Sequence, residues 1–426
     1  MDDLPLLMDD RELFRIHNGE ISGPETRFLF AGDLVFSNGW DSPPFGGSLF
    51  EIIQNSDYAC VNLEAPIKHG DTIDKNGPTL STLPETPKIL SETGFDITCL
   101  ANNHMMDYGY ESVEKTIDGC TEAGIATVGT GRTRAEAIEP HIHTQNGHRV
   151  ALYNVCQHEF GVASATAPGT AWIDSPGLIR NIMTTRSDVD FVFVVVHGGN
   201  ENVPLPSIRW QERLRELVDA GADAVVAHHP HVPQGWEMFE GSPIFYSLGN
   251  FAFDQTKYDA NQWGYCVELC LQKNEITRAN LLLTERIGRS IQTMGEDRGR
   301  KEHYEFLQSV SDIIETSPMN PGYWQAVAQQ LYSSKYKTFF TRFGGGDPIS
   351  LYNSPIDEMK RMFHLAVNRA EVPEKKLKLL NFVRAEAHRE AIIAALEVET
   401  GTVKDHRTPD IQSTIDELYD CLYYGI

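Results

Sequence analysis

Short apolar segments alternate with amphipathic segments from residue 27 to about residue 285, and this alternation limits the fold more than any other feature. The apolar segments have the length and composition of strands, and they are RFLFAG (27–32), YACVNL (58–63), ITCL (97–100), RVALYNV (149–155), FVFVVV (191–196), AVVA (224–227) and IFYSL (244–248). Helical patterns between them stop at a glycine, as at Gly124 and Gly221. Repeated strand, helix and strand predict a layered α/β fold.

The pattern changes near residue 290. The segment YCVELCLQKNEITRANLLLTERI predicts a hairpin that turns near Lys273–Glu275. Beyond it, charged stretches with helical periodicity follow, such as EMKRMFHLAVNRA and KKLKLLNFVRAEAHREAIIAALEVE. We therefore predict an N-terminal extension over 1–26, an α/β domain over 27–288 and a helical C-terminal region over 289–426.

The charge balance narrows the classes of partner. Lys+Arg number 36 and Asp+Glu number 60 among 426 residues, which gives a formal net charge of −24. Such a charge argues against nucleic acid and against an anionic membrane surface as partners. The first residues, MDDLPLLMDDRELFRI, are acidic with short apolar pieces, and predict neither a signal peptide nor a membrane span. The 7 cysteines form no CxxC motif, so we expect a soluble protein in a reducing, cytoplasmic compartment.

Polar residues that can bind metal follow several of the predicted strands. They are Asp33 after FLFAG, Glu64 after VNL, Asn102, Asn103 and His104 after ITCLA, His197 after FVFVVV, and His228, His229 and His231 after AVVA. Ligands of open α/β sheets bind outside the carboxyl ends of the strands. We therefore predict that these side chains, although far apart in the sequence, gather in one crevice.

The residue types in this set suit a metal centre. Imidazole and carboxylate groups bind zinc, manganese or iron, and a carboxylate can bridge two cations. Two cations about 3.5–4 Å apart can activate water and polarise a phosphoryl oxygen. Pro230 constrains the turn between His229 and His231, so the two imidazoles can reach different cations. A lone strand-end histidine such as His197 is more often a structural residue, but the whole constellation favours a shared site.

Seven motifs resemble those of the CapA/PgsA family, which is linked to bacterial capsule and poly-γ-glutamate synthesis. In chain order they are AGDLVF, VNLEAPI, LANNHMMDYG, AGIATVGTG, HGGNE, LVDAGADAVVAHHPHVPQGWE and YSLGNFAFDQ, within residues 28–255. The family has a calcineurin-like metallophosphoesterase fold. The resemblance thus implies a layered β-sandwich flanked by helices, here with a C-terminal helical extension.

The resemblance also implies a set of metal ligands and a cofactor of one or two divalent transition-metal ions, Mn, Fe or Zn. The implied ligands are Asp33 as a terminal ligand, Glu64 as the bridging carboxylate, Asn103, His197 and His229 on one cation, and His231 with Asp33 and Glu64 on the other. Metallophosphoesterases usually begin with Asp-x-His, whereas this chain has Val35 in place of that histidine. The site could therefore hold one cation firmly and the second weakly, or work with none.

Further roles follow from the same resemblance. His104 looks like the general acid that protonates a leaving oxygen, with Asp33 and Glu64 as the other catalytic groups. Asn102, Glu201 and Asn250 are predicted to lie near the substrate.

Three functions are consistent with these residues. The first is a metal-dependent phosphoesterase-like hydrolase that acts on peptide-like or phosphorylated substrates and supports capsule or poly-γ-glutamate-type polymer synthesis. The second is a metal-independent peptide epimerase or isomerase, in which His104, Glu64 or Asp33 moves a proton in the same crevice. The third is a non-catalytic accessory subunit of the polymer-synthesis machinery, with the helical region as its partner surface.

Overall fold

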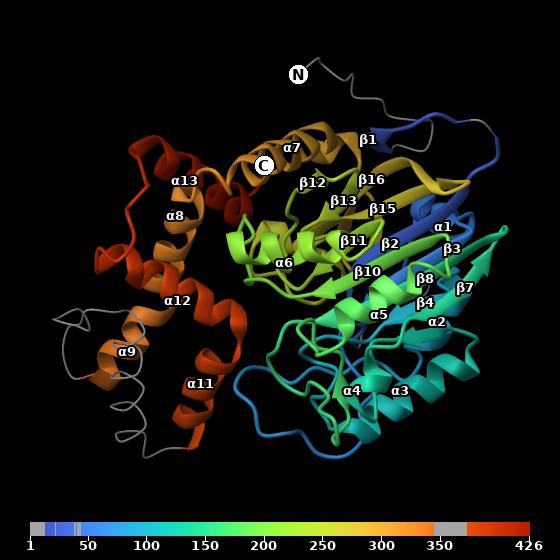
Figure 1. Ribbon diagram of the computed structural model, residues 1–426, viewed down its shortest axis with the longest axis horizontal. Coiled ribbons are helices and arrows are strands. Elements are labelled where there is room, and N and C mark those ends of the chain that lie inside the picture. Colours follow the sequence, from blue (N-terminus) through green and yellow to red (C-terminus); the bar gives the residue numbers. More distant parts are fainter. Residues whose placement is uncertain (1–12, 22, 38–39, 41–43, 345–372) are drawn as a thin grey trace.

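Two β-sheets stacked face to face form the centre of the computed structural model, which describes residues 13–21, 23–37, 40, 44–344 and 373–426 (Figure 1). The 9-stranded sheet has the order β1-β16-β15-β2-β3-β4-β5, with β14 beside β2 and β17 beside β16. Its strands are β1 (Phe14–Asn18), β2 (Thr26–Leu34), β3 (Tyr58–Leu63), β4 (Ile97–Cys99), β5 (Ala126–Val128), β14 (Asn250–Ala252), β15 (Trp263–Gln272), β16 (Glu275–Ile287) and β17 (Ser290–Thr293).

The second sheet has 6 strands in the order β12-β13-β11-β10-β8-β7. They are β7 (His141–Gln145), β8 (His148–Cys156), β10 (Phe191–His197), β11 (Ala224–His228), β12 (Trp236–Phe239) and β13 (Ser242–Phe245). A small 2-stranded sheet pairs β6 (Thr130–Gly131) with β9 (Gly169–Thr170). The predicted layered α/β class is confirmed, as is the hairpin of β15 and β16.

Alternation along β2 explains how the sheets stack. Phe28 and Phe30 face the second sheet, where each ring centroid lies 5.6 Å from that of Phe193. Leu29 and Ala31 face the opposite way, into the apolar cluster beneath the outer helices. Successive strand residues point to opposite faces, so an apolar run such as FLFA buries both faces of its strand.

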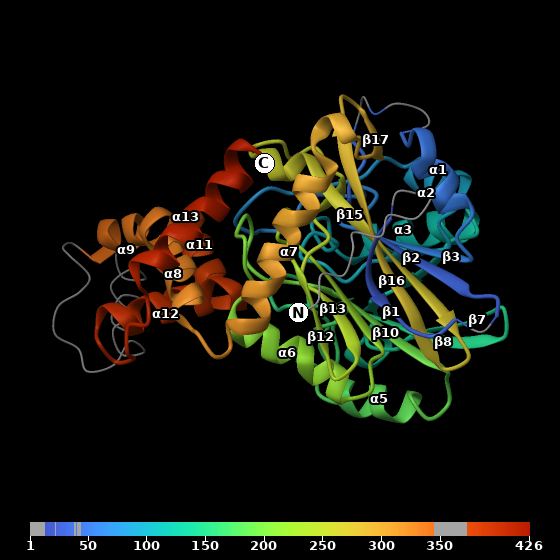
Figure 2. The same cartoon turned by 90° about the horizontal axis from the view of Figure 1, so that it is seen from above.

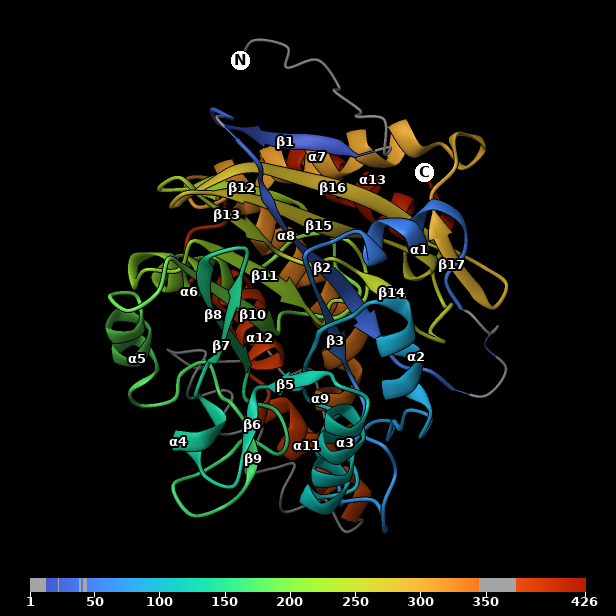
Figure 3. The same ribbon diagram turned by 90° about the vertical axis from the view of Figure 1, so that its right-hand side faces the viewer.

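Helices cover the outer face of each sheet, giving four layers (Figures 2 and 3). Beside the larger sheet lie α1 (Gly47–Gln54), α2 (Thr86–Thr93) and α3 (Tyr110–Glu122). Beside the second sheet lie α5 (Leu178–Thr185) and α6 (Ile208–Asp219), while α4 (Arg134–Ala137) follows β6. None of the helices in the described part of the chain has the length and apolar character needed to cross a bilayer.

The C-terminal region is helical and packs beside the sandwich (Figure 1). It comprises α7 (Arg300–Thr316), α8 (Gly322–Leu331), the π-helical turn η3 (Tyr332–Tyr336), α9 (Lys337–Gly344), α11 (Pro373–Arg384), α12 (Glu386–Glu399) and α13 (Pro409–Tyr424). Most of its buried apolar residues belong to the same core cluster as those between the sheets. The predicted helical stretch EMKRMFHLAVNRA lies outside the described residues.

Both segments that flank the predicted α/β domain are joined to it. β1 lies within the predicted extension 1–26 and pairs with β16, and Phe14 of β1 stacks on Tyr304 of α7 at 4.3 Å between ring centroids. β17 and α7 follow residue 288, and β17 also pairs with β16. The division at residues 26 and 288 therefore stays a prediction about sequence segments, while the core runs across both limits.

Candidate metal centre

The side chains that follow the central strands meet at one edge of the sandwich. Strands β2, β3 and β4 are parallel to one another, and so are β10 and β11. Asp33 lies near the end of β2, Glu64 directly follows β3, and His197 is the last residue of β10. All three are buried. Parallel neighbours end at the same edge of their own sheet, and the stacking of the two sheets brings His197 within 3.9 Å of Asp33 and 3.6 Å of Glu64.

One cluster of possible ligands consists of Glu64, His197 and His229. One ligand atom from each lies within 4.8 Å of the others. Nε2 of His197 is 3.6 Å from Oε1 of Glu64 and 3.1 Å from Nδ1 of His229. Oδ1 of Asn103 lies 3.1 Å from the same Nε2 and adds a neutral oxygen donor.

A second cluster consists of Asp33, Glu64 and His231. Nδ1 of His231 is 3.5 Å from Oδ2 of Asp33, and its Nε2 is 3.4 Å from Oε1 of Glu64. Glu64 belongs to both clusters. Val35, two residues after Asp33, packs in a buried apolar cluster with Phe253 and supplies no ligand atom. The second cluster therefore offers fewer possible metal ligands than the first.

The turn at His229, Pro230 and His231 separates the two imidazoles. His229 has φ of 99° and His231 has φ of 57°, values that are uncommon outside glycine. Such backbone costs about 1–3 kcal/mol per residue and tends to occur at functional sites. The N–H of His229 donates to Oδ2 of Asp33 at 3.2 Å, and the carbonyl of Pro230 accepts from the N–H of Asn202 at 2.8 Å. These bonds hold a turn that directs each ring into a different cluster.

The charges of the two clusters fit divalent cations. Both carboxylate oxygens of Glu64 are buried with no hydrogen-bond partner among the described residues. Burial, and then the charge of Asp33, raises the pKa of Glu64 well above its ordinary value. Burial also raises the pKa of Asp33, but neighbouring imidazoles, first that of His228, outweigh burial and hold that pKa low. A buried carboxylate without a partner is costly, and a cation beside neutral imidazoles would offset that cost.

His104 lies beside these clusters in the loop after β4. Its Nδ1 is 2.8 Å from Oδ2 of Asp107 and 3.1 Å from Nζ of Lys75, and Lys75 and Asp107 form an ion pair. Asp107 also accepts a hydrogen bond from the N–H of Leu80 at 2.7 Å. Burial lowers the pKa of His104 and outweighs Asp107, which raises it. Asp107 fixes the imidazole through Nδ1, which leaves Nε2 for a substrate.

The side-chain amides of two of the three predicted substrate-binding residues are hydrogen-bonded within the protein. Asn102 donates through Nδ2 to the carbonyl of the last β3 residue at 2.9 Å, and its Oδ1 accepts from the N–H of Met105 at 2.8 Å. Asn250 donates through Nδ2 to the carbonyl of Asn261 at 3.0 Å, and its Oδ1 is 3.0 Å from Nδ1 of His231. Both amides are thus bonded within the protein and help to position neighbouring segments, and their contact with substrate stays a prediction.

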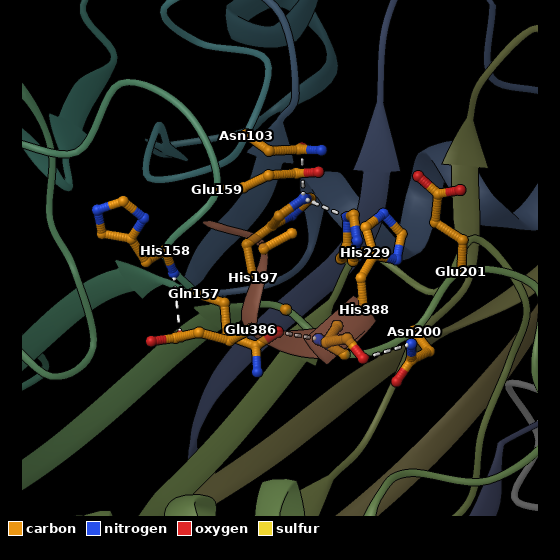
Figure 4. A pocket seen from close by; sticks show the side chains of 14 residues that line it. Asn103, Gln157, His158, Glu159, His197, Asn200, Glu201, His229, Glu386 and His388 are labelled. Carbon is orange, nitrogen blue, oxygen red and sulfur yellow. Dashed lines mark hydrogen bonds between the residues drawn. The ribbon is translucent and has the colours of Figure 1, made fainter. Parts of the chain in front are cut away.

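The third residue, Glu201, lines two adjoining cavities where the C-terminal region meets the sandwich. The smaller cavity lies against the first ligand cluster, and Figure 4 shows side chains of both regions around it. It is lined by Asn103, Gln157, His158, Glu159, His197, Gly198, Gly199, Asn200, Glu201, His229, Ala385, Glu386, Ala387 and His388. The other cavity, of about 240 Å³, is lined by residues that include His104, Lys75, Lys335, Lys378 and His388.

Several residues at the site were missed in the sequence. Nδ2 of Asn62 is 2.7 Å from Oδ1 of Asp33 and 3.2 Å from Nδ1 of His197. Asn62 precedes Glu64 by two residues, so strand alternation could have placed it on the same face. Glu159, whose pKa burial raises to about 7, and His388 follow no motif of the chain, and no sequence signal points to them.

Comparison with known proteins places residues 27–255 in the family described as bacterial capsule synthesis protein PGA_cap. The capsule biosynthesis protein CapA of Bacillus anthracis is 37% identical over 214 residues, which cover 48% of this chain and 52% of that protein. The PGA biosynthesis protein CapA of Bacillus subtilis (strain 168) is 34% identical over 210 residues, which cover 48% of this chain and 55% of that protein. The matches therefore span about half the length of these relatives.

More distant matches include a probable polyglutamine synthesis accessory protein of Mycobacterium tuberculosis, 27% identical over 228 residues, which cover 50% of this chain and 60% of that protein. Among solved structures, a novel phosphatase from Mycoplasma pneumoniae has a TM-score of 0.38 at 14% identity, covering 61% of this chain and 94% of that one. A 5'-nucleotidase precursor from Thermus thermophilus has a TM-score of 0.38 at 12% identity, covering 75% of this chain and 68% of that one. At these values the two structural likenesses do not bear on activity.

Proposed function

Because this chain belongs to the PGA_cap family of bacterial capsule synthesis proteins, we propose that it supports synthesis of a capsule or poly-γ-glutamate-type polymer as a metal-dependent, phosphoesterase-like hydrolase. The observation that carries the proposal is the pair of ligand clusters that share the buried carboxylate of Glu64. A shared carboxylate is the arrangement by which a protein holds two cations close together. A cytoplasmic location remains a prediction.

Glu64, Asn103, His197 and His229 would hold one cation, and Asp33, Glu64 and His231 would hold the other. Mn, Fe or Zn suits these donors. When bound, such cations supply Lewis acidity toward a phosphoryl oxygen and lower the pKa of a water molecule.

The chain's own residues then orient the substrate and move a proton. His104 donates its Nε2 proton to the leaving oxygen, while Nδ1–H donates to Asp107, whose charge stabilises the imidazolium. Asn102 holds the turn from which Asn103 and His104 project, because its Oδ1 accepts from the N–H of His104 at 3.2 Å.

A single experiment tests the proposal on the full-length protein. Elemental analysis of purified protein is followed by a screen of phosphomonoesters and phosphodiesters, with wild type, His104→Ala and the control His69→Ala, whose side chain is 53% exposed. We expect bound transition metal, hydrolysis by wild type and the control, and a kcat lower by roughly 10²–10⁴ in His104→Ala with metal content unchanged. Absence of metal together with insensitivity to chelators would refute it.

A second candidate is a non-catalytic accessory role in polymer synthesis, favoured by the name of the Mycobacterium tuberculosis relative, a probable accessory protein. The two functions are separated by polymer output in cells that carry the His104→Ala variant. Normal output would favour the accessory role, because the variant lacks the proton donor but keeps the fold. Reduced output with normal protein abundance would favour catalysis.

A further inference from the structure

The C-terminal region forms one wall of the site. The first turn of α12 is bonded to the loops that follow β8 and β10. Nδ2 of Asn200 donates to the carbonyl of Ala387 at 3.0 Å, and the N–H of His158 donates to Oε2 of Glu386 at 3.2 Å. These bonds bring His388 to the edge of the ligand clusters, where Figure 4 shows it near His229.

The same wall carries two lysines that line the cavity of about 240 Å³. Nζ of Lys335, in the π-helical turn η3, is 3.9 Å from Oε2 of Glu201. Nζ of Lys378 lies 5.6 Å from the ring centroid of Phe339 and 5.8 Å from that of Phe382. No carboxylate of the described residues pairs with Lys378. π-helical turns are rare and are often found at functional sites.

The position of this cavity relates the lysines to the reaction. His104 also lines it, and His104 faces the leaving oxygen in the proposed function. A group attached to that oxygen would extend toward Lys335 and Lys378. With a formal net charge of −24 the protein repels anions at long range, so an anionic group would need local cations to bind.

We propose that Lys378 and Lys335 form a subsite that binds an anionic group, a carboxylate, on the leaving-group side of the substrate. The proposal rests on the proposed function and names its substrate class: a phosphomonoester whose alcohol carries a carboxylate. Water attacks phosphorus, the bond between phosphorus and the leaving oxygen breaks, and the His104 proton goes to that oxygen, which yields phosphate and a carboxylated alcohol. The cavity is smaller than the roughly 300–1,000 Å³ usual for small-molecule sites, so this leaving group is compact.

The test compares two matched substrates, 3-carboxyphenyl phosphate and its carboxamide counterpart, 3-carbamoylphenyl phosphate, on the metal-loaded full-length protein. We expect kcat/KM to be about tenfold higher for the carboxylate, as for a charge-assisted hydrogen bond. Lys378→Gln should raise KM about tenfold for the carboxylate substrate with little change in kcat, and should leave the carboxamide unaffected. Lys335→Gln should act in the same direction.

The matched control is Lys257→Gln, because Nζ of Lys257 also lies over an aromatic ring, 4.5 Å from the centroid of Tyr258, and Lys257 lines neither cavity. It should leave both substrates unchanged. Equal use of both substrates, or equal losses for both in Lys378→Gln, would overturn the subsite. Equilibrium binding of the non-hydrolysable carboxyphenyl phosphonate separates this result from failure of the proposed function. If the protein hydrolyses neither substrate, weaker binding of the phosphonate by Lys378→Gln but not by Lys257→Gln still supports the subsite. Equal binding of the phosphonate by these two variants refutes it.

Discussion

At the scale of single residues, the site depends on ionisable groups held away from water. Glu64 and Asp33 are both fully buried, yet their pKa values move in opposite directions. Asp33 has imidazoles and the amide of Asn62 beside it, whereas the oxygens of Glu64 lack hydrogen-bond donors among the described residues. Two like groups thus differ because of their immediate neighbours, and Glu64 is the one that gains most from a cation.

Replacing Glu64 with Gln should make the stability of the metal-free protein less dependent on pH. The folded-state pKa of Glu64 is raised above its ordinary 4.5, so the folded state binds more protons than the unfolded state between these two values. This contribution to stability is complete below 4.5 and is lost as pH rises through the raised pKa. The free energy of unfolding of Glu64→Gln, measured by urea denaturation at several pH values, should therefore increase relative to that of wild type as pH rises. A constant difference would contradict the prediction.

Asp107→Asn should shift the pH profile of hydrolysis toward acid. His104 must be protonated to donate, and its pKa already lies below the ordinary 6.5 because burial outweighs the effect of Asp107. Removing the charge of Asp107 lowers that pKa further, so the alkaline decline of kcat/KM should begin at lower pH. The measurement is the kcat/KM profile of both proteins. A profile that keeps its position while only its height falls would show that Asp107 acts by packing alone.

At the scale of elements, the close approach of β14 to β2 positions Asp33. A Cβ on Gly32 would lie 2.3 Å from the carbonyl oxygen of Gly249, nearer than real Cβ contacts come. The N–H of Asp33 donates to that same carbonyl at 3.1 Å. Strand β2 can therefore carry its ligand into the site because the preceding residue has no side chain.

Gly32→Ala should separate β14 from β2 and weaken metal binding. The added methyl group meets backbone, which cannot rotate away, so we expect a loss of stability of about 1–3 kcal/mol and a weaker affinity for Mn²⁺. Thermal unfolding and a metal titration measure the two effects. Gly46→Ala is the control, since a Cβ there would lie 3.6 Å from its nearest neighbour, Oγ of Ser290. Equal behaviour of the two variants would show that the contact does not matter.

At the scale of the whole molecule, the metal centre joins parts of the chain that lie far apart. Its residues come from both sheets, and the C-terminal region closes one side of it. Cations bound by both sheets would therefore stabilise the sandwich as a unit. Cations bound by local loops alone would not have this effect. A ligand stabilises only the part of the folded protein to which it binds.

Removing metal should lower the melting temperature of the entire protein. A cation at a hundred times its Kd contributes about 2.7 kcal/mol, which corresponds to a shift of a few degrees in a large protein. Calorimetry before and after dialysis against a chelator measures the shift, and added Mn²⁺ or Zn²⁺ should restore it. The melting temperature of His231→Ala should change less than that of wild type when metal is removed. An unchanged melting temperature would show that the clusters hold no cation under those conditions.

The sequence by itself determined the alternation of strands and helices, and it identified the polar residues at the strand ends, because apolar periodicity and strand-end chemistry are local properties. It placed Asp33, Glu64 and His197, together with His229 and His231 of the HHPH motif, at one edge through the rule for parallel strands. Only the tertiary structure showed which groups the amides bond, since Asn102 donates to backbone and Asn250 lies 3.0 Å from His231. It also decided that the C-terminal region supplies His388, Lys335 and Lys378, because contacts such as that between Asn200 and Ala387, which span 187 residues, depend on packing that no local pattern encodes.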